Sequence, residues 1–194
     1  MQIKASNPRS STIAPILLSP TPALPDQSSL SFSPESLYLK LGQASEAAIQ
    51  INSQGRFPTL IQLEIGYDPQ VITQTELTPD TFFANPQILL NNNDEQTGRL
   101  SYALSLPPDE TVHLEGGRLQ RSESHDSFQV GMGKVAKLKF TVKKNTSAKE
   151  SLLNFLPKTE MLSQNTNIPL EISNGLKIYI TNPTPTASPS SFLR

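Results

Sequence analysis

The clearest pattern of hydrophobic and polar positions lies in residues 59–72, with the sequence TLIQLEIGYDPQVI. One set of alternate positions is apolar or aromatic and the other is polar or small: Ile61, Leu63, Ile65 and Tyr67 against Gln62, Glu64 and Gly66. This two-residue period predicts a strand with one face buried and the other face in water. Asp68-Pro69 ends the strand, because proline lacks the backbone donor and fixes φ, and a second strand is expected from residue 71.

The same alternation recurs along the chain, and turn residues separate the runs. Apolar positions alternate with polar ones at 37–41, 47–52, 100–106 and 136–143, and shorter apolar segments occupy 30–32, 87–90, 151–156 and 176–180. Many short strands with little helical periodicity are typical of a sandwich. The sequence therefore predicts an all-β fold, an antiparallel jelly-roll-like β-sandwich of about nine strands with little helix.

Three local features refine this picture. Thr78-Pro79-Asp80 predicts the start of a helical turn that carries Phe82 and Phe83 into the core and stops at residues 85–86. Residues 91–98 are expected to form a polar loop. Lysines at 137, 139 and 143 share the outer side of their strand, which is typical of a strand protected against edge-to-edge pairing.

Composition and charge exclude several classes of protein. Charged residues are 17% of the chain and the net charge is -1, which gives no field for nucleic acid or an anionic membrane. The absence of cysteine excludes disulfides and thiolate chemistry. Residues 13–18 are the most apolar N-terminal piece but contain Pro15, so no transmembrane segment and no signal peptide is recognised.

The chain divides into three parts by composition. Residues 1–28 form a Pro/Ser-rich N-terminal linker, residues 29–181 form the folded domain, and residues 182–194 form a Pro/Thr/Ser-rich C-terminal tether. A folded unit between two such segments is expected to be one module of a longer assembly.

The order of several motifs resembles that of a known family. They are Leu-Ser-Phe-Ser-Pro at 30–34, Tyr-Asp-Pro at 67–69, Gly-x-Leu-x-Tyr-Ala at 98–103, Gly-x-Val-Ala-x-Leu-x-Phe-x-Val-Lys at 133–143 and Gly-x-x-Ile-x-Ile at 175–180. This order, over residues 29–181, resembles the cohesin domains and their relatives among the carbohydrate-binding-module-like sandwiches. The segment 107–127 is longer and more charged than this resemblance leads one to expect.

The resemblance implies a function as well as a fold. Cohesin-like domains are non-catalytic modules of extracellular or cell-surface proteins, and they mediate protein–protein attachment to a dockerin-type or other surface partner. The face that the family uses would carry Gln62, Glu64, Ser101, Ala103 and Ser105 in this sequence. These small and polar residues suit a docking surface, and they equally suit a solvated sheet.

Two other functions stay open. A carbohydrate-binding module linked to polysaccharide degradation would stack sugars on exposed aromatic rings, and Tyr38 and Tyr179 fall on outer faces, although the chain has no Trp. A passive structural spacer in a surface stalk would bind neither a protein nor a sugar.

Candidate chemistry is sparse. His113 and His125, with the neighbouring Glu115, Glu123 and Asp126, are read as a solvated polar loop rather than a metal or acid–base site. No nucleophile motif or phosphate-binding glycine loop is present, so we expect no enzyme, no catalytic residue, no metal and no other cofactor. Residues 91–95, Asn-Asn-Asn-Asp-Glu, offer oxygen ligands for Ca²⁺ without the spacing of an EF-hand, which leaves calcium binding there an open question.

Overall fold

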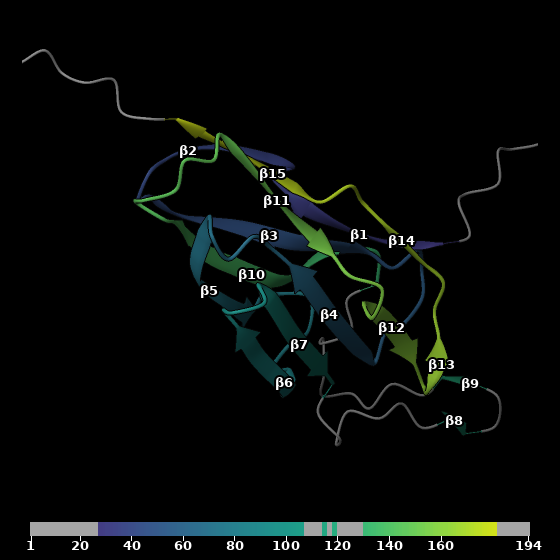
Figure 1. Cartoon of the computed structure of the whole chain (residues 1–194). Coiled ribbons are helices and arrows are strands. Elements are labelled where there is room, and N and C mark those ends of the chain that lie inside the picture. Colours follow the sequence, from purple (N-terminus) through teal and green to yellow (C-terminus); the bar gives the residue numbers. More distant parts are fainter. Residues whose placement is uncertain (1–26, 107–113, 116–117, 120–129, 182–194) are drawn as a thin grey trace, which may run out of the picture.

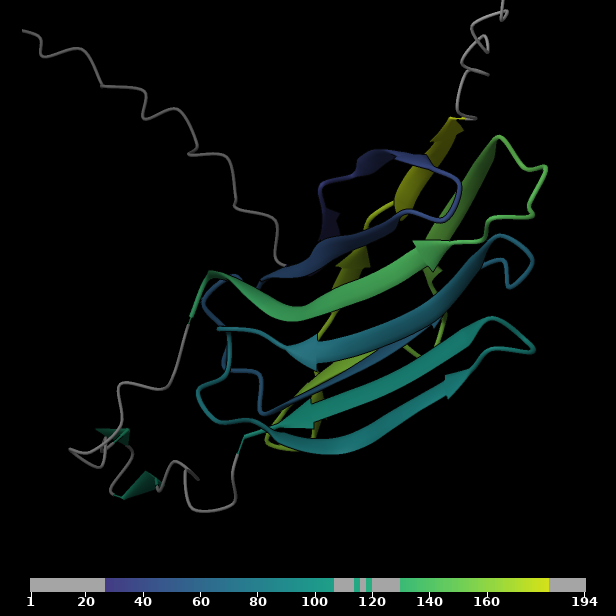
Figure 2. The same cartoon turned by 90° about the vertical axis from the view of Figure 1, so that its left-hand side faces the viewer.

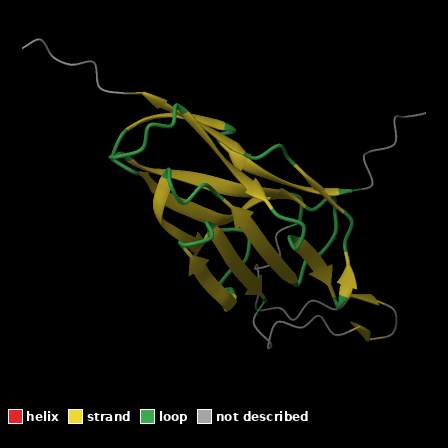
Figure 3. Ribbon diagram, viewed as in Figure 1, coloured by secondary structure: helices red, strands yellow, loops and turns green. Residues whose placement is uncertain are grey.

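The domain consists of two packed β-sheets. The computed structural model describes residues 27–106, 114–115, 118–119 and 130–181, and no helix occurs in these residues (Figures 1 and 3). The predicted all-β sandwich is confirmed. No segment of the described chain is a helix long and apolar enough to cross a membrane.

One sheet has five strands. Their order is β14 (Leu170–Ile172), β1 (Ser28–Ser33), β3 (Ala44–Asn52), β10 (Met132–Val142) and β5 (Ile72–Pro79). β14 runs parallel to β1, and the other neighbours are antiparallel. β10 therefore lies inside this sheet, between β3 and β5.

The other sheet has eight strands and is centred on β4 (Leu60–Gly66). On one side β4 pairs with β7 (Arg99–Ser105), which pairs in turn with β6 (Gln87–Asp94). The other side continues through β12 (Glu160–Ser163) and β13 (Thr166–Asn167), and through β11 (Glu150–Phe155), β15 (Leu176–Thr181) and β2 (Ser36–Lys40). A separate ribbon pairs β8 (Leu114–Glu115) with β9 (Arg118–Leu119).

The chain passes from one sheet to the other between β1 and β2, at the cis peptide bond Ser33-Pro34. β2 then pairs in parallel with β15 near the end of the described chain. The structure has more strands than the nine predicted for two reasons. The segment 28–40 is divided into β1 and β2, and short strands such as β13 and β14 are counted separately.

The core lies between the sheets. Ile61, Leu63 and Ile65 of β4 have no exposed surface, and β10 contributes a second buried row of Ala136, Leu138, Phe140 and Val142. Phe32 and Phe155 stack with ring centroids 4.4 Å apart and join the two sheets. The inner faces predicted from the alternation in these two segments are confirmed.

The helical turn predicted at residues 78–80 is wrong. Thr78 and Pro79 are the last residues of β5 and pair with Lys137 and Ala136 of β10. Proline is tolerated there because β5 is the edge strand of its sheet, where a missing donor breaks no ladder. The turn that follows does carry Phe82 and Phe83 into the core, where they are 1% and 5% exposed.

The polar loop predicted at residues 91–98 is also wrong over its first half. β6 continues to Asp94, because Asn91–Asp94 pair with residues 99–102 of β7, and only residues 95–98 form the turn. Asn93 is fixed on the inner side: its Nδ2 donates to the Thr75 carbonyl at 2.9 Å and its Oδ1 accepts from the Tyr67 hydroxyl at 3.0 Å.

The lysines of β10 do not protect an edge, because β10 is an interior strand. On the outer face, Lys137 and Lys139 flank Glu46 of β3, with Nζ–Oε distances of 3.9 and 3.8 Å. They are cross-strand charge partners of a solvated sheet.

Gly98 provides a direct test of the β6–β7 turn. Its φ is +68°, and a Cβ atom there would overlap the carbonyl oxygen of Tyr67. We expect Gly98→Ala to lower the free energy of unfolding by about 2–4 kcal/mol, from the left-handed backbone and the overlap together. Urea denaturation measures the change.

The control is Gly55→Ala, where φ is +79° and no atom lies within 4 Å of the added Cβ. Only the backbone cost of roughly 1–2 kcal/mol is expected there. Equal losses for the two variants would contradict the close approach at Gly98.

Candidate functional site

The structure brings the five predicted face residues together. In the antiparallel register of β4 and β7, Gln62 lies opposite Ala103 and Glu64 opposite Ser101, while Ser105 lies opposite Leu60. We call the outer surface made by Gln62, Glu64, Ser101, Ala103 and Ser105 the β4–β7 face. It lies at the centre of the eight-stranded sheet, on the side away from the core.

The environment of Glu64 differs from the one predicted from the sequence. Although it lies on the outer side, its side chain is only 5% exposed, and Oε2 accepts a hydrogen bond from Arg99 Nε at 2.7 Å. Arg99 lies opposite Gly66, so the guanidinium reaches Glu64 diagonally across the strands. The expectation that Glu64 faces water is wrong, because the Arg99 side chain covers it.

The backbone of Glu64 is held just as firmly. Its carbonyl accepts a hydrogen bond from Leu156 N at 2.7 Å, and the Thr159 hydroxyl accepts from Glu64 N and donates to Glu64 O, both at 3.0 Å. The loop 156–159, which joins β11 to β12, therefore lies beside β4 at this point. The carboxylate at the centre of the face has a fixed position.

The rest of the β4–β7 face is shallow. Ala103 is 5% exposed, and Gln62, Ser101 and Ser105 are half-buried. Two apolar side chains that sequence reasoning missed flank these residues. Leu90 of β6, opposite Ala103, is 39% exposed, and Leu152 of β11 is 44% exposed. Both belong to short apolar runs that look like buried strands in the sequence.

A hollow adjoins the β4–β7 face beside Arg99. Gly66, Asp68, Asp94 and Asn154 line it, with Leu152 and Leu156 as apolar walls. The Asp94 carboxylate is hydrogen-bonded within the turn. Its Oδ1 accepts hydrogen bonds from the backbone N of Gln96 and Thr97, and its Oδ2 accepts one from the Thr97 hydroxyl at 2.7 Å. These hydrogen bonds, with the Thr97 hydroxyl first, hold the pKa of Asp94 below its ordinary value.

Residues 91–95 do not form the loop on which a calcium site was considered, because most of them belong to β6. The side-chain oxygens of Asp94 and Asn93 accept hydrogen bonds from other residues of the domain. Within the described parts of the chain, no group of three or more His, Asp or Glu residues could hold a metal ion.

Tyr38 and Tyr179 come together on β2 and β15. They are direct neighbours in the parallel register, and their rings stack with centroids 4.9 Å apart and an interplanar angle of 20°. Each ring covers one face of the other, so the open face is that of Tyr38, which is 72% exposed on an edge strand. Sugar stacking at this pair stays a prediction.

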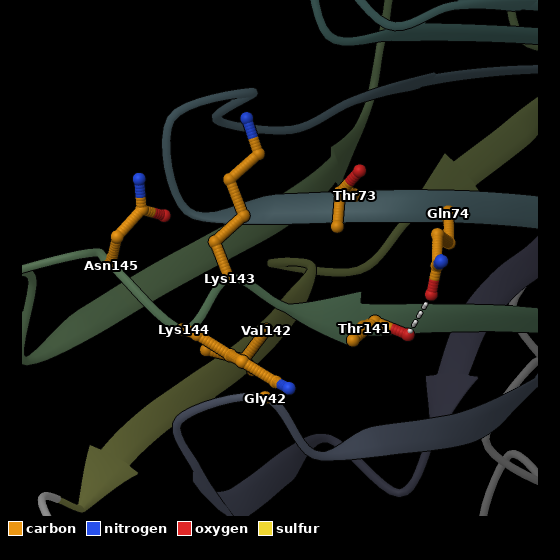
Figure 4. Close-up of a pocket in the computed structure, with 8 residues that line it drawn as sticks. All are labelled: Gly42, Thr73, Gln74, Thr141, Val142, Lys143, Lys144 and Asn145. Atoms are coloured by element: carbon orange, nitrogen blue, oxygen red, sulfur yellow. Dashed lines mark hydrogen bonds between the residues drawn. The ribbon is translucent and has the colours of Figure 1, made fainter.

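A second hollow lies between the end of β10 and the start of β5 (Figure 4). Thr141 donates a hydrogen bond to Gln74 Oε1 at 3.0 Å, and the Lys144 side chain packs over Gly42. The lining contains lysines, amides and hydroxyls but no carboxylate or imidazole to act as a base. His113, Glu123, His125 and Asp126 lie outside the described residues, as do residues 1–26 of the predicted linker 1–28 and the tether 182–194.

No protein-family model matches the sequence, and no curated protein is significantly similar to it. Solved structures do match. The seventh ScaB type I cohesin of Pseudobacteroides cellulosolvens aligns with a TM-score of 0.62 and 14% identity, over 82% of this chain and 95% of that one. The domain has the cohesin fold.

Two further cohesin structures align over similar lengths. The OlpC cohesin of Clostridium thermocellum, solved in a type I cohesin–dockerin complex, gives a TM-score of 0.56 and 15% identity over 80% of this chain and 93% of that one. The third ScaB cohesin of R. flavefaciens, solved with a group 1 dockerin, gives a TM-score of 0.56 and 15% identity. That alignment covers 84% of this chain and 100% of that one. At these identities the likeness establishes the fold, and the resemblance predicted from the motif order is confirmed at that level.

The Arg99–Glu64 pair can be tested by removing the cation. Arg99→Ala leaves the Glu64 carboxylate enclosed without its partner, and we expect a loss of about 1–3 kcal/mol in unfolding free energy. This expected loss of unfolding free energy is smaller than that for a fully buried ion pair, because the Arg99 side chain is 43% exposed. Urea denaturation at neutral pH measures it.

Lys139→Ala is the matched control, since it removes one cation from a pair whose Glu46 side chain is 52% exposed. A change below about 0.5 kcal/mol is expected. An Arg99→Ala loss no larger than this would show that Arg99 does not stabilise the face.

Proposed function

We propose that this domain is a non-catalytic, cohesin-like binding module that attaches its parent protein to a dockerin-type or other surface partner through the β4–β7 face. The observation that carries the proposal is the composition and rigidity of that face. A buried carboxylate is neutralised by Arg99 at its centre, small side chains surround the pair, and exposed Leu90 and Leu152 flank it.

This arrangement suits a flat protein partner. Protein interfaces combine apolar anchors with hydrogen-bonding groups and few unpaired charges at their centre. Leu90 and Leu152 supply apolar contact, and Ser101 and Gln62 supply hydrogen-bonding groups. Arg99 uses Nε for Glu64, which leaves its terminal amino groups as donors for a partner's carbonyl or carboxylate oxygens.

Rigidity favours binding in a second way. The face residues stand on two paired interior strands whose opposite sides are packed in the core, so little conformational entropy is lost on association. The fold relatives solved with dockerins support this partner class. The proposal includes an extracellular or cell-surface location, which the resemblance to cohesins implies.

The test is a single substitution in the centre of the face. Ser101→Arg places a long side chain beside Arg99, which should block a closely fitting partner by its bulk. We expect the dissociation constant for a captured dockerin to rise at least tenfold, about 1.4 kcal/mol. Surface plasmon resonance over a panel of immobilised dockerins provides the measurement.

The control is Gln50→Arg, at a half-buried outward position of β3 on the opposite sheet. It should leave the dissociation constant unchanged. Weakening by Gln50→Arg but not by Ser101→Arg would assign binding to the other face, and failure of every dockerin to bind the wild type would contradict the proposed partner class.

The stacked Tyr38–Tyr179 pair supports the second candidate, a carbohydrate-binding module. If the open Tyr38 ring receives a sugar, affinity electrophoresis on cellulose, chitin or xylan should retard the wild-type domain, and Tyr38→Ala should abolish the retardation. Equal mobility in gels with and without each polysaccharide would remove this candidate and leave the protein-binding function.

A further inference from the structure

The hollow between the end of β10 and the start of β5 is lined by cations, amides and hydroxyls. We call this space, which is drawn in Figure 4, the β5–β10 hollow; its volume is about 550 Å³ and it is open to solvent. The two strand ends and the turn between β2 and β3 meet there, at one end of the sandwich (Figure 2). The volume lies in the range of small-molecule sites, roughly 300–1,000 Å³, and is much larger than one inorganic ion needs.

Two lysines of this hollow have no carboxylate partner among the described residues. Lys143 and Lys144 take part in no ion pair of that part of the chain, whereas Lys137 and Lys139, earlier in β10, pair with Glu46. The residues that line the hollow include no Asp or Glu. Two cations beside a recess without carboxylates raise the local potential, which favours an anionic group there.

One of these lysines is positioned by a glycine. Gly42 has a φ of +75°, and its backbone N donates to Val142 O at 2.9 Å, which docks the β2–β3 turn onto the end of β10. A Cβ atom on Gly42 would lie 2.8 Å from Lys144 Cγ, so a larger residue there would displace the lysine stem. Figure 4 shows this stem on the side of Gly42 and Lys143 on the opposite side, towards Thr73. The two ammonium groups therefore flank the hollow.

Gln74 is held in a left-handed conformation at a β-bulge. Gln74 and Thr75 of β5 lie opposite the single residue Phe140 of β10. The φ of Gln74 is +53°, a conformation that glycine usually takes in such a bulge. Its backbone N donates to Glu95 Oε1 at 3.2 Å, and its Oε1 accepts from the Thr141 hydroxyl. The side chain is thus held beside the hollow at the expense of backbone strain.

Strain of this kind indicates a function for Gln74. Left-handed non-glycine residues lower the stability of a fold, and they cluster at binding sites and switches. With Oε1 engaged, Gln74 Nε2 has no partner among the described residues and has two hydrogens to donate. Thr73 and Asn145 add a hydroxyl and a second amide to the lining, and these groups accept hydrogen bonds as well as donate them.

We propose that the β5–β10 hollow binds an acidic saccharide, a sugar that carries a carboxylate or sulfate group. The oxyanion pairs with the ammonium groups of Lys143 and Lys144. The sugar hydroxyls exchange hydrogen bonds with Gln74, Thr73 and Asn145. A free inorganic anion would pair with the lysines only and would give no hydrogen to the accepting oxygens of the lining, so the lining favours a saccharide.

This site is separate from the surfaces already described. β5 and β10 belong to the five-stranded sheet, whereas the β4–β7 face and the Tyr38–Tyr179 pair belong to the eight-stranded sheet. The saccharide is therefore titrated into the protein without any dockerin, and its failure to bind leaves the proposed function untouched.

Nuclear magnetic resonance titration of the isotope-labelled chain provides the test. The probes are trigalacturonate, sulfated maltotriose, neutral maltotriose and inorganic phosphate. We expect at least one of the two acidic trisaccharides to bind with a dissociation constant on the order of 1 mM, and to shift the resonances of Gln74, Lys143 and Lys144. The tighter of the two identifies the oxyanion.

Three results would overturn the proposal. They are the absence of binding by both acidic sugars, equal binding of neutral maltotriose, and equal binding of inorganic phosphate, which would assign the hollow to a free anion.

Two charge-matched double variants test the lysines. Lys143→Gln with Lys144→Gln should raise the dissociation constant about tenfold, as expected for the loss of two exposed ion pairs. Lys158→Gln with Lys177→Gln removes the same two charges from exposed positions outside the hollow and should leave the constant unchanged. Equal weakening by the two double variants would show attraction to net charge alone and contradict a defined site.

Gln74→Gly separates binding from stability. Glycine suits the φ of +53°, so the melting temperature should stay the same or rise, while loss of the amide should raise the dissociation constant about threefold. A lower melting temperature with unchanged saccharide binding would show that Gln74 is purely structural and would overturn its assignment to the site.

Discussion

The burial of one strand face is the constraint on which the rest of the structure depends. Ile61, Leu63 and Ile65 of β4 have no exposed surface, and the five-stranded sheet, with β10 at its interior, covers them. Because side chains alternate with a period of two, fixing these residues inward also fixes Gln62 and Glu64 outward. The outer face cannot slip without exposing the core, so the positions of its residues are fixed by the burial of the inner face.

Local periodicity explains what could be predicted from the sequence. The inner faces of β4 and β10 and the position of Phe82 and Phe83 in the core followed from patterns within a few residues. The β4–β7 face was located by resemblance, and the structure places its five residues on neighbouring strands. The prediction of a helical turn failed because Thr78-Pro79 fits a helix cap and also the end of an edge strand.

What could not be predicted depends on pairing between distant segments. The burial of Glu64 requires Arg99, 35 positions along the chain, and only the β4–β7 register brings the two together. Likewise, lysines on β10 suggest an edge until β5 is known to pair beyond it, while β6, which looks like a short buried strand, is an edge strand of its sheet. Strand order is a property of the whole sheet, and alternation carries no information about it.

We have proposed that a partner binds the outer side of the eight-stranded sheet. Nuclear magnetic resonance of the isotope-labelled domain, titrated with a dockerin that it binds, maps the contact residue by residue. We expect shift changes concentrated on β4, β7, β6 and β11, with those of Arg99 and Ser101 among the largest and β3 unaffected. Changes concentrated on the outer side of the five-stranded sheet would contradict it.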